Sequence, residues 1–167
     1  FAAGALACAL LGLAPESRAA SYTSFWTLGD SLSDDGNLYA ATGGQAPPKP
    51  YFEGRFSNGP VWAEHVAADF TAKGLATGNF AYGGAAVEPL ANGPFPSPPV
   101  VNLGGQIDAF AAESAGKLGK RPVASLWFGA NDLLFNGVPT GTAREVGKKA
   151  ANGVAAGLDH AARHLER

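Results

Sequence analysis

One serine stands where a turn would follow a strand. Ser31 lies in the segment Gly29-Asp30-Ser31-Leu32, directly after the β-rich run at residues 24–28. A serine hydroxyl on a rigid turn acts as a nucleophile when a base takes its proton and N–H donors stabilise the oxyanion. The N–H of Ser31 would itself point at that oxyanion if a helix began at this turn. Ser31 is therefore our candidate nucleophile.

Two further turns offer oxyanion donors. The Gly83-Gly84 pair follows a predicted strand at residues 79–81, and Asn131 follows a predicted strand at residues 123–128. A glycine N–H suits this role because no side chain blocks the approach of a substrate. The Asn131 carboxamide is a side-chain donor of the kind found in oxyanion holes. Ligands of open parallel sheets bind beyond the carboxyl ends of the strands, so we expect these turns to converge on one site.

The elements that must position these residues follow an α/β pattern. Apolar runs that predict strands alternate with amphipathic stretches that predict helices. The run at residues 123–128 (VASLWF) predicts a fully buried central strand. The first predicted helix follows Asn58-Pro60 and has Trp62, Val66 and Phe70 on its buried face. The second covers residues 105–118, with Ile107 and Phe110 buried. The third is capped by Thr142 and has an apolar stripe of Val146, Ala150, Val154 and Leu158.

These blocks resemble the GDSL lipases and esterases, also called SGNH hydrolases. The resemblance runs through residues 25–37 (FWTLGDSLSDDGN), 54–62 (GRFSNGPVW), 79–85 (NFAYGGA) and 129–133 (GANDL). Four blocks in the family's order are far more specific than the four letters GDSL. The resemblance implies a flavodoxin-like three-layer α/β/α sandwich with a central parallel sheet. Residues 20–167 would form the N-terminal part of that single domain.

The resemblance also implies roles for the three turns. The family's nucleophile falls on Ser31 and its oxyanion asparagine on Asn131. Its oxyanion glycine falls on Gly84, five residues after Asn79, with Gly83 as the alternative. The implied activity is a serine hydrolase of the lipase or esterase type, which cleaves a small-molecule or lipid ester through an acyl-enzyme. A carbohydrate deacetylase and a lipid acyltransferase of the same superfamily stay open.

The histidines depart from the family pattern. The family carries its catalytic Asp and His as Asp-x-x-His, and none of His65, His160 and His164 completes that motif. We expect the pair beyond residue 167, so the polypeptide by itself should be nearly inactive. Oxyanion-hole and binding effects alone leave about 10³–10⁴ over water. A chain that naturally lacks the pair would be a pseudo-enzyme.

A non-catalytic, flavodoxin-like binding protein is the alternative of a different class. It would hold a phosphate group at the Gly-rich strand ends. The sequence contains neither Gly-x-Gly-x-x-Gly nor Gly-x-x-x-x-Gly-Lys, which disfavours this function. We predict no cofactor and no metal. Asp30, Asp34 and Asp35 are more typical of helix capping than of metal ligation, and His160 and His164 of a solvated helix face.

An aromatic loop leaves two interpretations open. Tyr51, Phe52 and Phe56 lie in the predicted loop at residues 43–59. They would either line the mouth of an acyl or lipid site or pack against the core.

Charge and the N-terminal residues bear on partners and location. The formal net charge is −2 and no basic run occurs, which argues against a nucleic-acid partner and a polybasic membrane patch. Residues 1–14 are uncharged, and Ser17 and Ala19 suit cleavage after Ala19. Residues 1–19 thus resemble a signal peptide without its basic start. The uncharged run of 14 residues is short for a membrane span, which needs about 20. We predict a secreted or periplasmic, bacterial protein with no transmembrane segment in the mature chain.

Overall fold

The computed structural model describes residues 21–90, 93–95, 100–135 and 143–165. The predicted signal peptide at residues 1–19 and the predicted cap Thr142 lie outside these ranges. No helix within the described ranges is long and apolar enough to cross a membrane.

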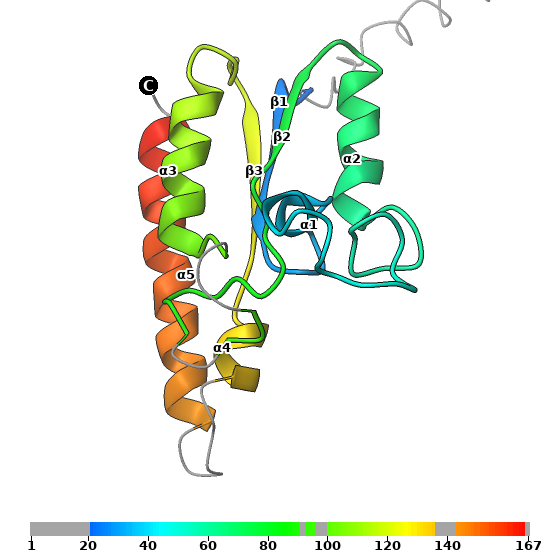
Figure 1. Ribbon diagram of the computed structural model, residues 1–167. Coiled ribbons are helices and arrows are strands. Elements are labelled where there is room, and N and C mark those ends of the chain that lie inside the picture. Colours follow the sequence, from blue (N-terminus) through cyan, green and yellow to red (C-terminus); the bar gives the residue numbers. More distant parts are fainter. Residues whose placement is uncertain (1–20, 91–92, 96–99, 136–142, 166–167) are drawn as a thin grey trace, which may run out of the picture.

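The centre of the fold is a three-stranded parallel sheet in the order β2-β1-β3 (Figure 1). Its strands are β1 (Ser24–Gly29), β2 (Ala76–Asn79) and β3 (Pro122–Trp127). Ser24 pairs with Ala76 on one side and with Pro122 on the other, so the strands begin at nearly the same level. Every residue of β1 is buried, because this strand has a neighbour on each side and helices on both faces.

Helices cover both faces of the sheet, as Figure 1 shows. On one side lies α2 (Trp62–Thr71), and on the other lie α3 (Leu103–Ser114) and α5 (Ala143–Leu165). Two short helices, α1 (Asn37–Ala41) and α4 (Ala130–Phe135), follow the turns that end β1 and β3. The expected α/β fold, with a parallel sheet between layers of helices, is confirmed.

Side chains of β1 alternate between the two helical layers, as a strand requires. Phe25 points toward α2, where its ring stacks on Phe70 at 5.5 Å. Trp26 and Leu28 point the other way, into the main hydrophobic core beneath α3 and α5.

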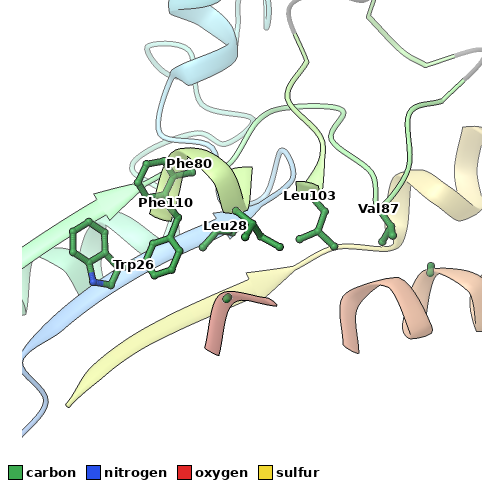
Figure 2. Close-up of a cluster of buried hydrophobic side chains, with 9 residues drawn as sticks. Trp26, Leu28, Phe80, Val87, Leu103 and Phe110 are labelled. Carbon is green, nitrogen blue, oxygen red and sulfur yellow. The ribbon is translucent and has the colours of Figure 1, made fainter. Parts of the chain in front are cut away.

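The main core extends along one face of the sheet (Figure 2). At one end the rings of Trp26, Phe80 and Phe110 meet, with Phe110 5.7 Å from Trp26 and 6.1 Å from Phe80. At the other end lie Leu103 and Val87, close to the turns that follow the strands. The hydrophobic core therefore extends up to the turns that follow the strands.

Two predicted strands need correction. The second strand was predicted at residues 79–81, but β2 covers Ala76–Asn79. The segment Ala76-Thr77-Gly78 is a weak strand former by composition, and it is a strand because it pairs with β1. The strand at residues 123–128 was predicted to be central and fully buried. In the described sheet β3 is an edge strand with partly buried residues, and Trp127 is 52% exposed, because burial depends on neighbours that an apolar run does not specify.

Helix boundaries and faces also differ from expectation. α3 begins at Leu103 rather than at residue 105, although Ile107 and Phe110 are buried as predicted. In α5 the predicted stripe fails at Leu158, which is 49% exposed, while Ala161 is buried. A step of four residues overshoots the 3.6-residue turn by about 40°, so a four-residue stripe rotates out of the core.

Phe110→Ala should destabilise the protein strongly. Its ring is fully buried between two other rings, so truncation leaves a cavity that rigid neighbours cannot fill. We expect a loss of about 3–5 kcal/mol in the free energy of unfolding, measured by urea denaturation. The exposed Leu134→Ala should change that free energy by less than about 0.5 kcal/mol. Equal effects of the two variants would contradict this core.

Candidate functional site

Ser31 lies in a tight turn that directly follows β1. The Asp30 N–H donates to the Trp127 carbonyl at 3.2 Å, which ties the turn to the end of β3. The Asp30 carbonyl in turn accepts the N–H groups of Ser33 at 3.0 Å and Asp34 at 3.1 Å. No helix begins at Ser31, because this turn closes on itself and α1 starts only at Asn37. A helix dipole is therefore not available at Ser31, but the Ser31 N–H makes no hydrogen bond within the described residues and stays open to a ligand.

Gly29 is the fixed point from which this turn leaves the sheet. The buried Gln106 side chain of α3 accepts the Gly29 N–H at 2.8 Å and donates to the Gly29 carbonyl at 2.9 Å. A Cβ at this position would lie 3.0 Å from Ser33 Oγ and 3.1 Å from the Trp127 carbonyl oxygen. Both contacts are tighter than an ordinary Cβ contact, so a larger residue at the end of β1 would require Ser33 or the end of β3 to shift by a few tenths of an ångström.

The buried carboxylate of Asp34 joins the first turn to the second. Its Oδ1 accepts the N–H groups of Gly36 at 2.8 Å and Asn37 at 2.6 Å, which start α1. Its Oδ2 accepts the N–H of Leu38 at 3.2 Å and, from across the site, that of Gly83 at 2.7 Å. One carboxylate thus organises α1 and holds the Gly83-Gly84 turn beside the Ser31 turn.

The three acidic residues of the first turn have raised pKa values. Burial raises the pKa of Asp34, and its four N–H donors oppose the rise. Burial also raises the pKa of Asp35, to about 6, and the negative charges of Asp34 and Glu64 add to the effect. The backbone N–H groups of α1 that Asp34 accepts support the capping role predicted for this residue.

Asp30 combines a backbone contact with a buried carboxyl oxygen. Its Oδ1 accepts the Leu32 N–H at 3.1 Å, while its buried Oδ2 has no hydrogen-bond partner among the described residues. Burial raises the pKa of Asp30; the Leu32 N–H opposes this, and the nearby Asp132 adds to it. The Asp30 carboxyl group therefore shapes the backbone around Ser31.

The two glycines of the second turn differ in what their N–H groups do. The Gly83 N–H is committed to Asp34, whereas within the described residues the Gly84 N–H makes no hydrogen bond. Gly84 has φ +82°, a conformation that favours glycine. A Cβ at Gly83 would lie 2.8 Å from Leu38 Cδ2, so this position also requires glycine. The geometry favours Gly84 over Gly83 as a donor to a ligand.

The third turn attaches to the second through two side chains of α4. Asn131 is buried, and its Nδ2 donates to the Ala85 carbonyl at 2.7 Å. A carboxamide has two N–H donors, so one remains after this bond. The carboxylate of Asp132 accepts the Val87 N–H at 3.1 Å from one oxygen and 3.2 Å from the other. Asp132 thus fixes the second turn relative to α4.

The structure therefore brings the three predicted turns together. The segment at residues 83–87 is bound from one side by Asp34 and from the other by Asn131 and Asp132. The Ser31 turn is bound to β3 through the Asp30 N–H. The convergence at the carboxyl end of the sheet agrees with the rule for open parallel sheets.

The histidines lie away from this network. His65 is exposed on α2, and His160 and His164 are neighbours on α5 with ring centroids 5.2 Å apart. Among the described residues no histidine accepts a hydrogen bond from Ser31, and no group of three or more His, Cys, Asp or Glu side chains is placed to hold a metal ion.

Several positioning side chains escaped the sequence analysis. Asn37 Nδ2 donates to the carbonyls of Asn79 and Ala81, both at 3.0 Å, and Asn79 Nδ2 donates to the Ser33 carbonyl at 2.8 Å. Gln106 was missed as well. The position of Gln106 in the sequence could have indicated its role, because an amide side chain on a buried, apolar helix face must find hydrogen-bond partners.

The sequence is similar to those of known proteins. The sequence matches the family model described as GDSL-like Lipase/Acylhydrolase over residues 26–166. It is 37% identical over 137 residues to a phosphatidylcholine-sterol acyltransferase of Aeromonas hydrophila. The aligned region covers 77% of this chain and 39% of that protein. It is also 37% identical over 118 residues to a thermolabile hemolysin of Vibrio parahaemolyticus serotype O3:K6, covering 67% of this chain and 26% of that protein.

The Asp35 carboxyl group should make stability depend on pH. Its pKa is about 6 in the folded protein against 3.8 in the unfolded chain, because burial raises it, the charges of Asp34 and Glu64 add to the rise, and Arg55 opposes it. The folded state binds the Asp35 proton more tightly than the unfolded chain does. Protonation of Asp35 therefore contributes fully to the free energy of unfolding below about pH 4, and this contribution is lost as the pH rises through 6. After allowance for solvent screening, this loss is about 1–2 kcal/mol.

Asp35→Asn should remove this part of the pH dependence. The free energy of unfolding, measured by urea denaturation from pH 4 to 7, should fall less in the variant than in the wild type. Asp69→Asn, an exposed carboxyl group on α2, is the matched control and should leave the slope unchanged. Parallel curves for wild type and Asp35→Asn would refute the raised pKa.

Proposed function

The chain belongs to the GDSL-like lipase/acylhydrolase family, and on that basis we propose that it supplies the nucleophile and oxyanion hole of a serine ester hydrolase. One observation carries the proposal. The Asp34–Gly83 and Asn131–Ala85 hydrogen bonds gather three turns, and these turns retain donors that the fold does not use. These donors are the Ser31 N–H, the Gly84 N–H and the second N–H of Asn131.

In the proposed first step, Ser31 Oγ attacks the carbonyl carbon of an ester. A carbon–oxygen bond forms, the carbonyl π electrons move onto its oxygen, and a base takes the Ser31 proton. The three donors stabilise the negative charge that develops on that oxygen. When the carbonyl re-forms, the bond to the alcohol breaks, and the alcohol leaves with the proton held by the base. The acyl group remains on Ser31 until water, activated by the same base, releases it as a carboxylic acid.

The base is proposed to be an Asp-His pair in a part of the protein that this chain does not contain. In support, no histidine among the described residues forms a hydrogen bond with Ser31, and His160 and His164 lie beside each other on α5. The chain also spans 39% and 26% of the lengths of the two relatives. Residues 20–167 alone should therefore hydrolyse esters very slowly, because the serine hydroxyl lacks a partner to take its proton.

Small-molecule or lipid esters are the substrates in this proposal. Export is part of the proposal because residues 1–19 resemble a signal peptide. One relative is named for acyl transfer to a sterol, so acyl transfer is a second candidate function. It requires only that an acceptor alcohol replace water in the second step. An ester product formed in the presence of an added alcohol would identify the transferase, whereas free acid alone would identify the hydrolase.

Ser31→Ala should abolish ester cleavage in the complete protein that carries this chain. We expect kcat/KM for p-nitrophenyl butyrate to fall by at least about 10³-fold, because removal of the nucleophile leaves only binding and oxyanion stabilisation. The same variant should lose labelling by a fluorophosphonate probe.

The control for this test is Ser21→Ala, which removes an exposed hydroxyl at the start of the described chain. It should leave both readouts unchanged. Undiminished hydrolysis by Ser31→Ala would reject Ser31 as the nucleophile, whereas no hydrolysis by the complete wild-type protein would favour a non-catalytic, flavodoxin-like binding protein.

Asn131→Ala should lower kcat by about 10²–10³-fold with little change in KM. The reason is that an oxyanion donor acts on the charge of the transition state rather than on the bound ester. Steady-state kinetics with the same ester measure the two constants, and thermal unfolding checks that loss of the Ala85 hydrogen bond leaves the fold intact. An equal rise in KM with unchanged kcat would exclude the oxyanion role.

A further inference from the structure

Two aromatic rings lie directly on the glycines of the second turn. The ring of Phe56 packs on Gly83, and that of Phe95 packs on Gly84, where a Cβ would be 3.0 Å from Phe95 Cδ2. The rings also contact each other, with centroids 5.8 Å apart. Phe56 is braced from outside by Tyr51, whose ring lies 5.5 Å away. Phe95 thus packs between Gly84 and the ring of Phe56.

The aromatic residues of the loop at residues 43–59 were expected either to line an acyl or lipid site or to pack against the core. Tyr51 and Phe52 are exposed, so they do not pack into the core. Phe56 is partly buried and contacts the candidate oxyanion turn rather than the main core.

A small cavity of about 60 Å³ opens beside Gly84. Its walls are largely apolar and include Leu90, Pro94, Phe95 and Val100. A cavity of about 150 Å³ holds a benzene molecule, so this one has room for roughly two or three carbon atoms. Gly84 belongs both to this cavity and to the proposed oxyanion hole, which places the cavity next to the ester carbonyl.

We propose that Phe95 limits the length of the acyl chain, so that this cavity accepts acetyl to butyryl groups. The inference rests on the proposed function. The acyl group is the better occupant because it stays on Ser31 until the second step, and a largely apolar cavity suits a retained alkyl chain. The alcohol has to leave toward solvent and be replaced by water.

The test compares acyl chain lengths in the complete protein. Wild-type kcat/KM should be highest for p-nitrophenyl acetate or butyrate and at least about tenfold lower for the octanoate, because each misplaced methylene is worth about tenfold or more. Phe95→Ala opens the cavity, so the ratio of kcat/KM for octanoate to that for acetate should rise at least about tenfold. Leu90→Phe fills it, so activity should persist on acetate and fall on butyrate.

Phe52→Ala is the matched control, since this exposed ring lies outside the cavity and should leave the ratio unchanged. A wild-type preference for octanoate, or an unchanged ratio in Phe95→Ala that still reacts with the fluorophosphonate probe, would overturn the proposal. So would a Phe95→Ala effect that appears among acetates of different alcohols instead of among acyl chains.

Two further results keep this test separate from the proposed function. If Phe95→Ala does not fold, Phe95→Leu and Leu90→Phe give the same comparison with smaller changes in volume. Hydrolysis that survives Ser31→Ala would reject the serine mechanism itself, whereas an unchanged chain-length ratio in an active enzyme rejects only the role of Phe95.

Discussion

The buried carboxylate of Asp34 is the constraint on which the site depends. A carboxylate without water must have its oxygens satisfied, and here four backbone N–H groups do so. Three of them belong to the start of α1 and the fourth to Gly83. Because each missing bond would leave a buried polar group unpaired, at about 1–3 kcal/mol, the carboxylate fixes α1 and the glycine turn relative to each other. The Gly83 N–H is used for structure, which leaves the Gly84 N–H for a ligand.

The same principle applies at the other junctions of the site. Gln106 uses both ends of its amide on Gly29, Asn131 binds the Ala85 carbonyl, and Asp132 accepts the Val87 N–H. In each case a side chain hydrogen-bonds to backbone, so it fixes the course of the chain. Turns after strands have backbone groups that no sheet satisfies, and these side chains supply the partners. Hydrogen bonds from these side chains to the backbone therefore hold the turns of the site in place.

Hydrophobic packing sets the frame in which these bonds form. The rings of Trp26, Phe80 and Phe110 anchor α3 to one face of β1, and Phe25 meets α2 on the other. Gln106 lies on α3 one residue before the buried Ile107, so the packing of that helix also delivers the amide to Gly29. The aromatic pair Phe56–Phe95 extends apolar packing onto the glycine turn. A cavity for part of a substrate thus arises next to groups that fix the backbone.

The sequence by itself determined the fold class, β1 as the strand before Ser31, and the blocks that define the family, because these depend on local composition and order. It also placed Ser31, Gly84 and Asn131 each after a strand. Only the tertiary structure decided that β1 rather than β3 is central, that β2 begins at Ala76, and that no helix starts at Ser31. It also distinguished Gly84 from Gly83, through a hydrogen bond between residues 49 positions apart. Such contacts depend on which segments meet in space, and local patterns of residues do not encode them.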